Sequence, residues 1–337
     1  MITEQDYRIF SEKCRWITSE INKDIIGQPT VVEGTVIAMI AGGNVLLEGV
    51  PGVGKTRLVR SLARAFNMPF SRIQFTPDLM PADVTGGNII VKDESGSSRF
   101  QFQPGPVFSN IVLADEINRA TPKTQSALLE AMQEHTVTVN GVSRKLPEPF
   151  FVLATQNPIE QDGTYLLPEA QLDRFMFKLI VGLPTIEELT DIVNLTQKTM
   201  DETAQPVMNG AELLQMREAA KNIPVVDQVM QYTMKLVSAT NPGGPYATES
   251  AKQYIKYGSS PRGAQALITT AKIRALMYGR FNVSFDDIHA MMMPVMRHRI
   301  KLNFEAVTSL KTPDDILIAI EKELNSKSGL HMHTAAK

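Results

Sequence analysis

The chain has 337 residues, which fits two domains, since a domain usually has about 100–200 residues. Its 34 Lys and Arg residues against 36 Asp and Glu residues give a net charge of −2, so we expect no nucleic-acid partner. The single cysteine, Cys14, excludes an internal disulfide, and no apolar run is long enough for a bilayer; we therefore expect a cytoplasmic protein without direct membrane insertion.

The first part of the chain has the pattern of a parallel sheet covered by helices. Short apolar runs alternate there with helical patterns, at residues 45–47, 73–75, 111–114, 151–154 and 177–181. Continuous apolar strands of this kind are typical of a sheet that is buried on both faces. Two predicted hairpins interrupt the pattern, at residues 86–104 and 136–146, and the second contains Asn140-Gly141, a pair that favours a two-residue turn.

A glycine-rich loop follows the first of these strands and precedes an amphipathic helix. The loop reads Gly49-Val50-Pro51-Gly52-Val53-Gly54-Lys55-Thr56, which is the spacing of a phosphate-binding loop. Its glycines let backbone N–H groups curl around phosphate oxygens, and the start of the helix adds a positive end. We expect Lys55 to reach the terminal phosphates of ATP and Thr56 to ligate Mg²⁺. A plain glycine turn is the disfavoured alternative.

Two carboxylates, Asp115 and Glu116, follow the apolar run at residues 111–114. Ligands bind at the carboxyl ends of the strands in open α/β sheets. We therefore expect Asp115 to hold Mg²⁺ through its water shell and Glu116 to activate the attacking water as a general base. Two solvated acids in a turn are the alternative, which the nearby phosphate loop disfavours.

Two further polar positions come later in this part of the chain. Asn157 is suited either to orienting the water or to forming a turn before Pro158, and its sequence context leaves both roles open. Arg174 offers a guanidinium without an evident helical partner, although a surface salt bridge is the ordinary role of such a residue.

After Pro184 the apolar residues recur at helical spacing, which predicts an all-helical second domain at residues 185–325 and a disordered tail at 326–337. In this domain Ser260 is the predicted N-cap and Pro261 the predicted first residue of a helix. Arg262 then lies in the first turn, where the helix dipole disfavours a cation. A nearby anion, such as the phosphates of a nucleotide, explains this position better.

Together these residues resemble the AAA+ superfamily, and within it the MoxR family, over essentially the whole chain. The matching segments are residues 26–28, 44–56, 102–108, 115–120, 154–158, 167–175 and 260–262. The resemblance implies an α/β fold, an AAA+ P-loop αβα sandwich at residues 1–184 with an N-terminal helix and a parallel sheet ordered 5-1-4-3-2, followed by a helical lid domain. It identifies residues 86–104 as a helix-2 insert and 136–146 as a pre-sensor-1 hairpin.

The resemblance also implies roles for residues that the pattern alone leaves open. Asn157 looks like sensor 1, Arg174 like an arginine finger that reaches a neighbouring subunit, and Arg262 like sensor 2. Ile26-Gly27 looks like part of the adenine pocket, and Arg119 resembles a second interface arginine. The implied partners are further copies of the chain in a hexameric ring and a client protein with a von Willebrand factor type A domain.

Several functions are compatible with a phosphate-binding loop. A GTPase is disfavoured because no Asn-Lys-x-Asp motif follows the loop, and a small-molecule kinase would not need Glu116. The favoured function is an ATPase that remodels or matures a partner protein. Two alternatives remain: a chelatase-like ATPase subunit that assists metal insertion, and a scaffold that assembles on ATP without turnover.

Overall fold

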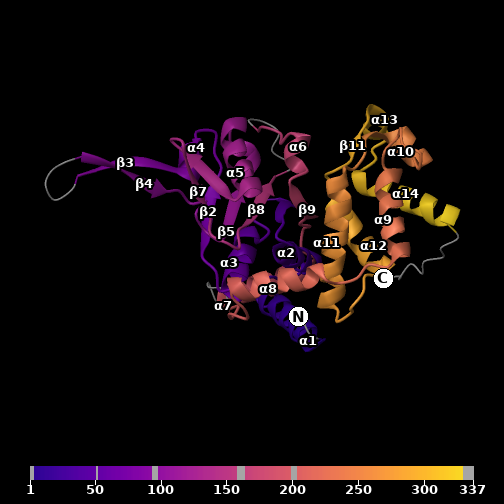
Figure 1. Ribbon diagram of the computed structural model, residues 1–337, viewed down its shortest axis with the longest axis horizontal. Coiled ribbons are helices and arrows are strands. Elements are labelled where there is room, and N and C mark those ends of the chain that lie inside the picture. Colours follow the sequence, from indigo (N-terminus) through magenta and orange to yellow (C-terminus); the bar gives the residue numbers. More distant parts are fainter. Residues whose placement is uncertain (1–3, 51, 93–97, 158–163, 199–202, 329–337) are drawn as a thin grey trace. The chain divides into compact units, whose positions relative to one another are not determined.

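The computed structural model describes residues 4–50, 52–92, 98–157, 164–198 and 203–328 (Figure 1). The chain forms two compact units that divide between Glu218 and Ala219. The first unit contains the sheet, and the second is mostly helical. Among the described residues, no helix is long and apolar enough to cross a membrane.

A parallel five-stranded sheet forms the centre of the first unit. Its strands are β1 (Asn44–Glu48), β2 (Phe70–Gln74), β5 (Ile111–Asp115), β8 (Phe151–Gln156) and β9 (Phe175–Ile180). They lie in the order β2-β5-β8-β1-β9. When these five strands are numbered 1 to 5 along the chain and read from β9 to β2, the order is 5-1-4-3-2, which confirms the prediction. The three central strands are buried until their last residues, Glu48, Asp115 and Gln156, so each strand brings a polar side chain to the carboxyl edge.

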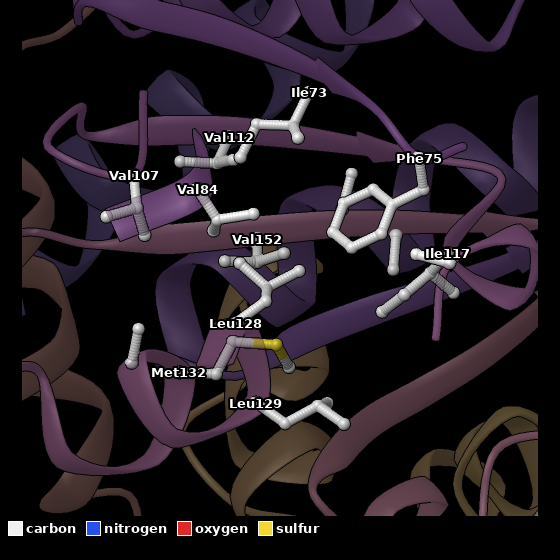
Figure 2. Packing of buried hydrophobic residues seen from close by; sticks show 14 of the residues in the cluster. Ile73, Phe75, Val84, Val107, Val112, Ile117, Leu128, Leu129, Met132 and Val152 are labelled. Carbon is white, nitrogen blue, oxygen red and sulfur yellow. The ribbon is translucent and has the colours of Figure 1, made fainter. Parts of the chain in front are cut away.

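Helices cover both faces of this sheet. On one face, α5 (Pro122–Glu134) packs Leu128 and Met132 into a cluster with Val112 of β5 and Val152 of β8 (Figure 2). On the other face, α2 (Pro29–Ala41) and α3 (Lys55–Ala65) contact the sheet, and α1 (Glu4–Asn22) packs on both helices. Because each fully buried aliphatic side chain stabilises the fold by about 1.5–3 kcal/mol, these two layers hold the polar edge in place.

Both predicted hairpins are present. β3 (Gly86–Lys92) pairs with β4 (Ser98–Pro104), and β6 (Thr136–Val139) pairs with β7 (Val142–Lys145). Asn140 and Gly141 have φ angles of 50° and 77°, the left-handed values that a type I′ turn requires. The hairpin β3–β4 projects from the rest of the first unit (Figure 1), and its connecting residues 93–97 lie outside the described residues.

Strand β3 lies against β6, and one side chain also joins the two hairpins. The guanidinium carbon of Arg144 on β7 lies 3.9 Å from the ring centroid of Phe102 on β4. Phe102 in turn makes an edge contact with Phe108, which packs against the core cluster. A cation over an aromatic face contributes about 0.5–1 kcal/mol at an exposed site, so the contact joins the hairpins without locking them.

Short helices and the segment after the sheet complete the first unit. They are α4 (Pro81–Thr85), the 3-10 helix η1 (Ile117–Arg119), α6 (Glu169–Leu172), α7 (Ile186–Lys198) and most of α8 (Gly210–Lys221). The units therefore divide beyond the predicted boundary at Pro184. The helical part of the chain does begin after Pro184, where the sheet ends. The first compact unit, however, continues to Glu218.

Hydrogen bonds explain why the segment after Pro184 stays with the sheet. The buried carboxylate of Asp24 accepts from the backbone N–H groups of Thr203 and Ala204, at 2.7 and 3.1 Å. Arg217 on α8 donates to the carbonyl oxygens of Met39 and Ile40, at 3.2 and 3.0 Å. These polar contacts join residues nearly 180 positions apart in the chain, which a local sequence pattern does not reveal.

The second unit contains six helices within the described residues: α9 (Asp227–Ala239), α10 (Glu249–Tyr254), α11 (Pro261–Met277), α12 (Phe285–Met296), α13 (Phe304–Thr308) and α14 (Pro313–Ser328). It also has a short antiparallel ladder that the sequence did not predict, between β10 (Ile255–Tyr257) and β11 (Lys301–Leu302). Helix α14 includes residues 326–328 of the predicted tail, and residues 329–337 lie outside the described residues.

Candidate functional site

A cavity of about 300 Å³ lies at the carboxyl edge of the sheet in the first unit. Its lining residues are Gly52, Gly54, Lys55, Thr56, Arg57, Arg72, Gln74, Asp115, Glu116 and Asn157. All but Arg57, Arg72 and Gln74 are among the site residues that the sequence predicts. The fold thus brings the start of α3, the ends of β2 and β5 and the residue after β8 to one place.

The loop between β1 and α3 uses its glycines for two different reasons. Gly52 and Gly54 have φ angles of 84° and 81°, and nothing lies within 4 Å of a Cβ built at either position. These two residues therefore supply backbone conformation and leave open space beside the backbone. At Gly49 a Cβ would lie 2.8 Å from the carbonyl oxygen of Val181, so glycine is needed there for close packing. Pro51 lies outside the described residues.

Lys55 is the first residue of α3, so its charge adds to the positive end of the helix. Its Nζ donates a hydrogen bond to the carbonyl oxygen of Gly49 at 2.6 Å. Burial lowers the pKa of Lys55, and the nearby carboxylates of Asp115 and Glu116 act in the opposite direction. A cation beside a helix N-terminus and a glycine loop forms a binding place for a phosphate group.

One hydroxyl positions both carboxylates. Thr155 on β8 donates through Oγ1 to Oδ1 of Asp115 at 2.6 Å and accepts from the backbone N–H of Glu116 at 2.8 Å. The parallel register explains this arrangement, because Ala114 is paired with Ala154 and the next residue of each strand follows. The sequence draws attention to this polar cluster but does not predict the role of Thr155.

The backbone of Glu116 is left-handed, with φ of 57°. This region is uncommon for a residue other than glycine, asparagine or aspartate. The conformation ends β5 and starts the 3-10 helix η1, at the point where the side chain reaches the cavity. A strained backbone at a cavity-lining carboxylate supports a functional role for that residue.

Strand β2 supplies two lining residues that the sequence analysis did not single out. Arg72 donates through Nη2 and Nε to Oδ2 of Asp115, at 2.7 and 3.3 Å. The same Nη2 donates to Oε1 of Gln74 at 2.7 Å, and Gln74 donates through Nε2 to Oε2 of Glu116 at 2.8 Å. Arg72 and Gln74 flank the buried Ile73, and this alternation along a strand was the available signal.

Arg174 lies near the amino ends of the strands, opposite the carboxyl edge where the cavity is. The next residue, Phe175, is paired with Asn44 at the start of β1, whereas Ile180 is paired with Glu48 beside the phosphate loop. Since a parallel strand rises about 3.3 Å per residue, Arg174 stands roughly 16–20 Å along the strand from the loop of its own subunit.

The remaining predicted residues are Arg119, Ile26, Gly27 and Arg262, and they lie in different parts of the fold. Arg119 donates to Oε2 of Glu116 at 3.1 Å, so it reaches a cavity residue of its own subunit. Ile26 and Gly27 lie between α1 and α2 and are half-buried, and Gly27 has a φ of 74°. Arg262 belongs to the first turn of α11 in the second unit.

The donor set fits a magnesium nucleotide. Thr56 and Asp115 offer a hydroxyl and a carboxylate, the oxygen donors that Mg²⁺ prefers. Lys55 and the open space beside Gly52 and Gly54 suit the phosphates, which a side chain at either glycine would crowd. Glu116 and Asn157 complete the lining with a base and an amide that can hold a water.

Comparison with known proteins gives a consistent result. Residues 44–177 match the family described as "ATPase family associated with various cellular activities (AAA)", and residues 247–320 match the AAA lid domain. The chain is 41% identical over 298 residues to the chaperone MoxR1 of Mycobacterium tuberculosis, covering 88% of this chain and 78% of that protein. It is 31% identical over 299 residues to the protein MoxR of Paracoccus denitrificans, covering 84% and 87% of the two chains.

Two further relatives extend the comparison. The protein YeaC of Bacillus subtilis is 44% identical over 287 residues, which cover 85% of this chain and 86% of YeaC. The crystal structure of a proposed ATPase from Cytophaga hutchinsonii matches with a TM-score of 0.87 at 37% identity, covering 95% of this chain and 96% of that one. The chain is therefore similar in sequence to both proteins and similar in fold to the second.

Proposed function

The chain belongs to the MoxR family of AAA+ ATPases, and we propose that it hydrolyses Mg²⁺-ATP to remodel a client protein. The observation that carries the ATPase part is a single cavity lined by Lys55, Asp115 and Glu116. A phosphate-binding cation, a metal-binding carboxylate and a general base are the parts that hydrolysis of a nucleoside triphosphate requires.

Each residue has its own task in this proposal. Lys55 and the backbone N–H groups of the loop bind the terminal phosphates, while Thr56 and Asp115 hold the metal. The bound Mg²⁺ neutralises charge on the phosphate oxygens. Glu116 accepts a proton from the attacking water, and the buried Asn157 orients that water or the γ-phosphate. Ile26-Gly27 contributes to the adenine pocket.

Two substitutions separate binding from hydrolysis. Lys55→Ala should weaken nucleotide binding, because it removes the cation beside the phosphates. Glu116→Gln should keep binding and lower hydrolysis by about 10²–10⁴-fold, because the amide cannot accept the proton. Binding of a fluorescent ATP analogue and release of phosphate measure the two effects. Equal turnover in Glu116→Gln and the unmodified protein would contradict the role of Glu116.

Two arginines outside the cavity wall belong to the same proposal. Arg174 acts as the arginine finger of a neighbouring copy in a hexameric ring, and its place at the far edge of its own sheet supports action on another subunit. Arg262, in the first turn of α11, acts as sensor 2, the role that the resemblance to the family implies.

The client contact is assigned to the hairpins. Ile90 and Phe100 form a cross-strand pair on β3 and β4, and these side chains are 66% and 74% exposed. Large apolar side chains that face water on a projecting hairpin are typical of a protein-binding surface. The client is proposed to be a protein with a von Willebrand factor type A domain, as in the family.

A double substitution tests this assignment. Ile90→Ser with Phe100→Ser should leave basal ATP hydrolysis unchanged and remove stimulation by the client, because neither residue lines the cavity. Phe304→Ser, an exposed apolar residue on α13, is the matched control. If sedimentation shows that the hairpin variant falls apart into monomers and loses basal activity, the hairpins serve assembly and the client role is wrong.

A further inference from the structure

Both carboxylate oxygens of Asp115 already have partners in this structure. Oδ1 accepts from the hydroxyl of Thr155, and Oδ2 accepts from two nitrogens of Arg72. Asp115 is the cavity carboxylate assigned above to the metal. A guanidinium therefore bonds to one of the two oxygens of the carboxylate that is proposed to serve the metal.

We propose that Arg72 is a counter-ion that competes with Mg²⁺ for Asp115, so that the requirement of nucleotide binding for Mg²⁺ is set in part by this arginine. The inference rests on the proposed function, because it assumes that Asp115 serves a magnesium nucleotide. Arg72 and the water shell of a bound metal would then compete for Oδ2 of Asp115.

Electrostatics explains why Arg72 and the metal exclude each other. The lining already contains the three cations Lys55, Arg57 and Arg72 against the two anions Asp115 and Glu116. A divalent cation placed beside Arg72 on the same carboxylate would meet a like charge at short range, and this repulsion is strongest in a partly desolvated cavity.

The exposure of the partners shows which of them moves. The side chain of Arg72 is 46% exposed, whereas that of Asp115 is 15% exposed. An exposed ion pair contributes little to stability, so a long side chain that reaches solvent can leave at low cost. Thr155 is fully buried within β8 and stays in place, which keeps Oδ1 oriented.

The departure of Arg72 also affects the general base. Arg72 donates to the amide oxygen of Gln74, and the amide nitrogen of Gln74 donates to Glu116. Because the same Nη2 of Arg72 donates to both Asp115 and Gln74, movement of Arg72 away from Asp115 would also disturb the contact with this amide. The chain Asp115, Arg72, Gln74, Glu116 thereby connects the metal carboxylate to the base, whose Oε2 also accepts a hydrogen bond from Arg119.

A magnesium titration tests the competition without measuring hydrolysis. A fluorescent ATP analogue is held at a fixed concentration with the protein, and Mg²⁺ is added from a metal-free starting point. In Arg72→Gln the half-saturating Mg²⁺ concentration should fall by about 3–5-fold, the equivalent of the upper range for an exposed ion pair. Arg72→Lys should give a smaller decrease, because lysine keeps the charge but loses the paired nitrogens.

The matched control is Arg8→Gln, which removes an arginine from an exposed ion pair with Glu4 on α1. It changes the net charge equally and should leave the magnesium requirement unchanged. An unchanged or increased requirement in both Arg72 variants would overturn the inference. Absence of nucleotide binding in the unmodified protein at any Mg²⁺ concentration would instead contradict the proposed function. If Arg72→Gln does not fold, Arg72→Lys alone decides.

Discussion

The carboxyl and amino edges of the five-stranded sheet, where its strands end and begin, carry different functional residues. At the carboxyl edge, the cavity gathers Lys55, Asp115 and Glu116 from the start of α3 and the end of β5. At the amino edge, Arg174 lies just before β9, beside the first residue of β1. A parallel sheet collects residues at one edge and keeps the other edge apart, which is why we propose that Arg174 serves the site of a different subunit.

The strongest test of this comparison is the removal of Arg174. Arg174→Ala should lower ATP turnover by about 10³–10⁵-fold, the usual contribution of an arginine finger, and leave nucleotide binding intact. Phosphate release and binding of a fluorescent ATP analogue measure the two quantities. A normal rate in the variant would show that the amino edge takes no part in the chemistry.

Mixing variants separates action within a subunit from action between subunits. Lys55→Ala subunits retain Arg174, and Arg174→Ala subunits retain an intact cavity. Mixed rings should therefore recover part of the turnover that each variant lacks alone. No recovery at any mixing ratio would contradict a shared site.

A smaller loss of ATP turnover is expected when the hydroxyl of Thr155, which positions Asp115 and Glu116, is removed. Thr155→Val keeps the shape of the side chain but removes the bonds to Asp115 and Glu116. Turnover should fall by about 10–100-fold, as is usual when a group that orients a metal ligand is lost. Thr35→Val on α2, which removes another buried hydroxyl, is the control and should keep full turnover. Equal loss in both variants would mean that the effect is one of stability.

The smallest effect on chemistry, and a clear effect on stability, is expected at Asp24. Its carboxylate accepts hydrogen bonds from the hydroxyl of Ser61 on α3 and from Thr203 and Ala204. Burial alone would raise the pKa of Asp24, but the hydrogen bonds, led by that from the backbone of Thr203, outweigh burial and lower the pKa. Asp24→Asn should cost about 1–3 kcal/mol of unfolding free energy, because the amide cannot satisfy every donor.

The pH dependence at Asp24 has a definite sign. Because the pKa is lower in the folded chain than in the unfolded one, ionised Asp24 stabilises the fold above the unfolded value of about 3.9. This contribution is lost as the pH falls through the folded pKa. Unfolding in urea between pH 7 and pH 3 should therefore show a smaller loss of stability in Asp24→Asn than in the unmodified chain. Asp191→Asn, on the exposed surface of α7, should behave as the unmodified chain does.

Most residues that line the cavity could be found from the sequence because they follow local patterns. Gly52, Lys55 and Thr56 belong to one loop, and Asp115 and Glu116 directly follow a buried run. The parallel sheet then brings these short segments together, whatever the lengths of the helices between them. The order of the strands could be predicted only from the resemblance to a family, because an apolar run does not show which strands lie next to it in the sheet.

The remaining parts depend on contacts between distant positions. Arg72 and Asp115 are 43 residues apart, and their pairing follows only from the register of β2 with β5. The late boundary between the units depends on Asp24 and Arg217, each bonded to a residue more than 170 positions away. The β10–β11 ladder has strands of three and two residues, too short for an alternating pattern.

The left-handed backbone of Glu116 has a consequence for the evolution of the family. Such a conformation costs about 1–3 kcal/mol for an ordinary residue, and asparagine or glycine would adopt it more easily. Glutamate at this position therefore costs stability, and the use of its carboxylate in the cavity is what offsets that cost. In a relative that kept the fold but no longer hydrolysed ATP, a residue that adopts the left-handed backbone more easily is expected in place of Glu116.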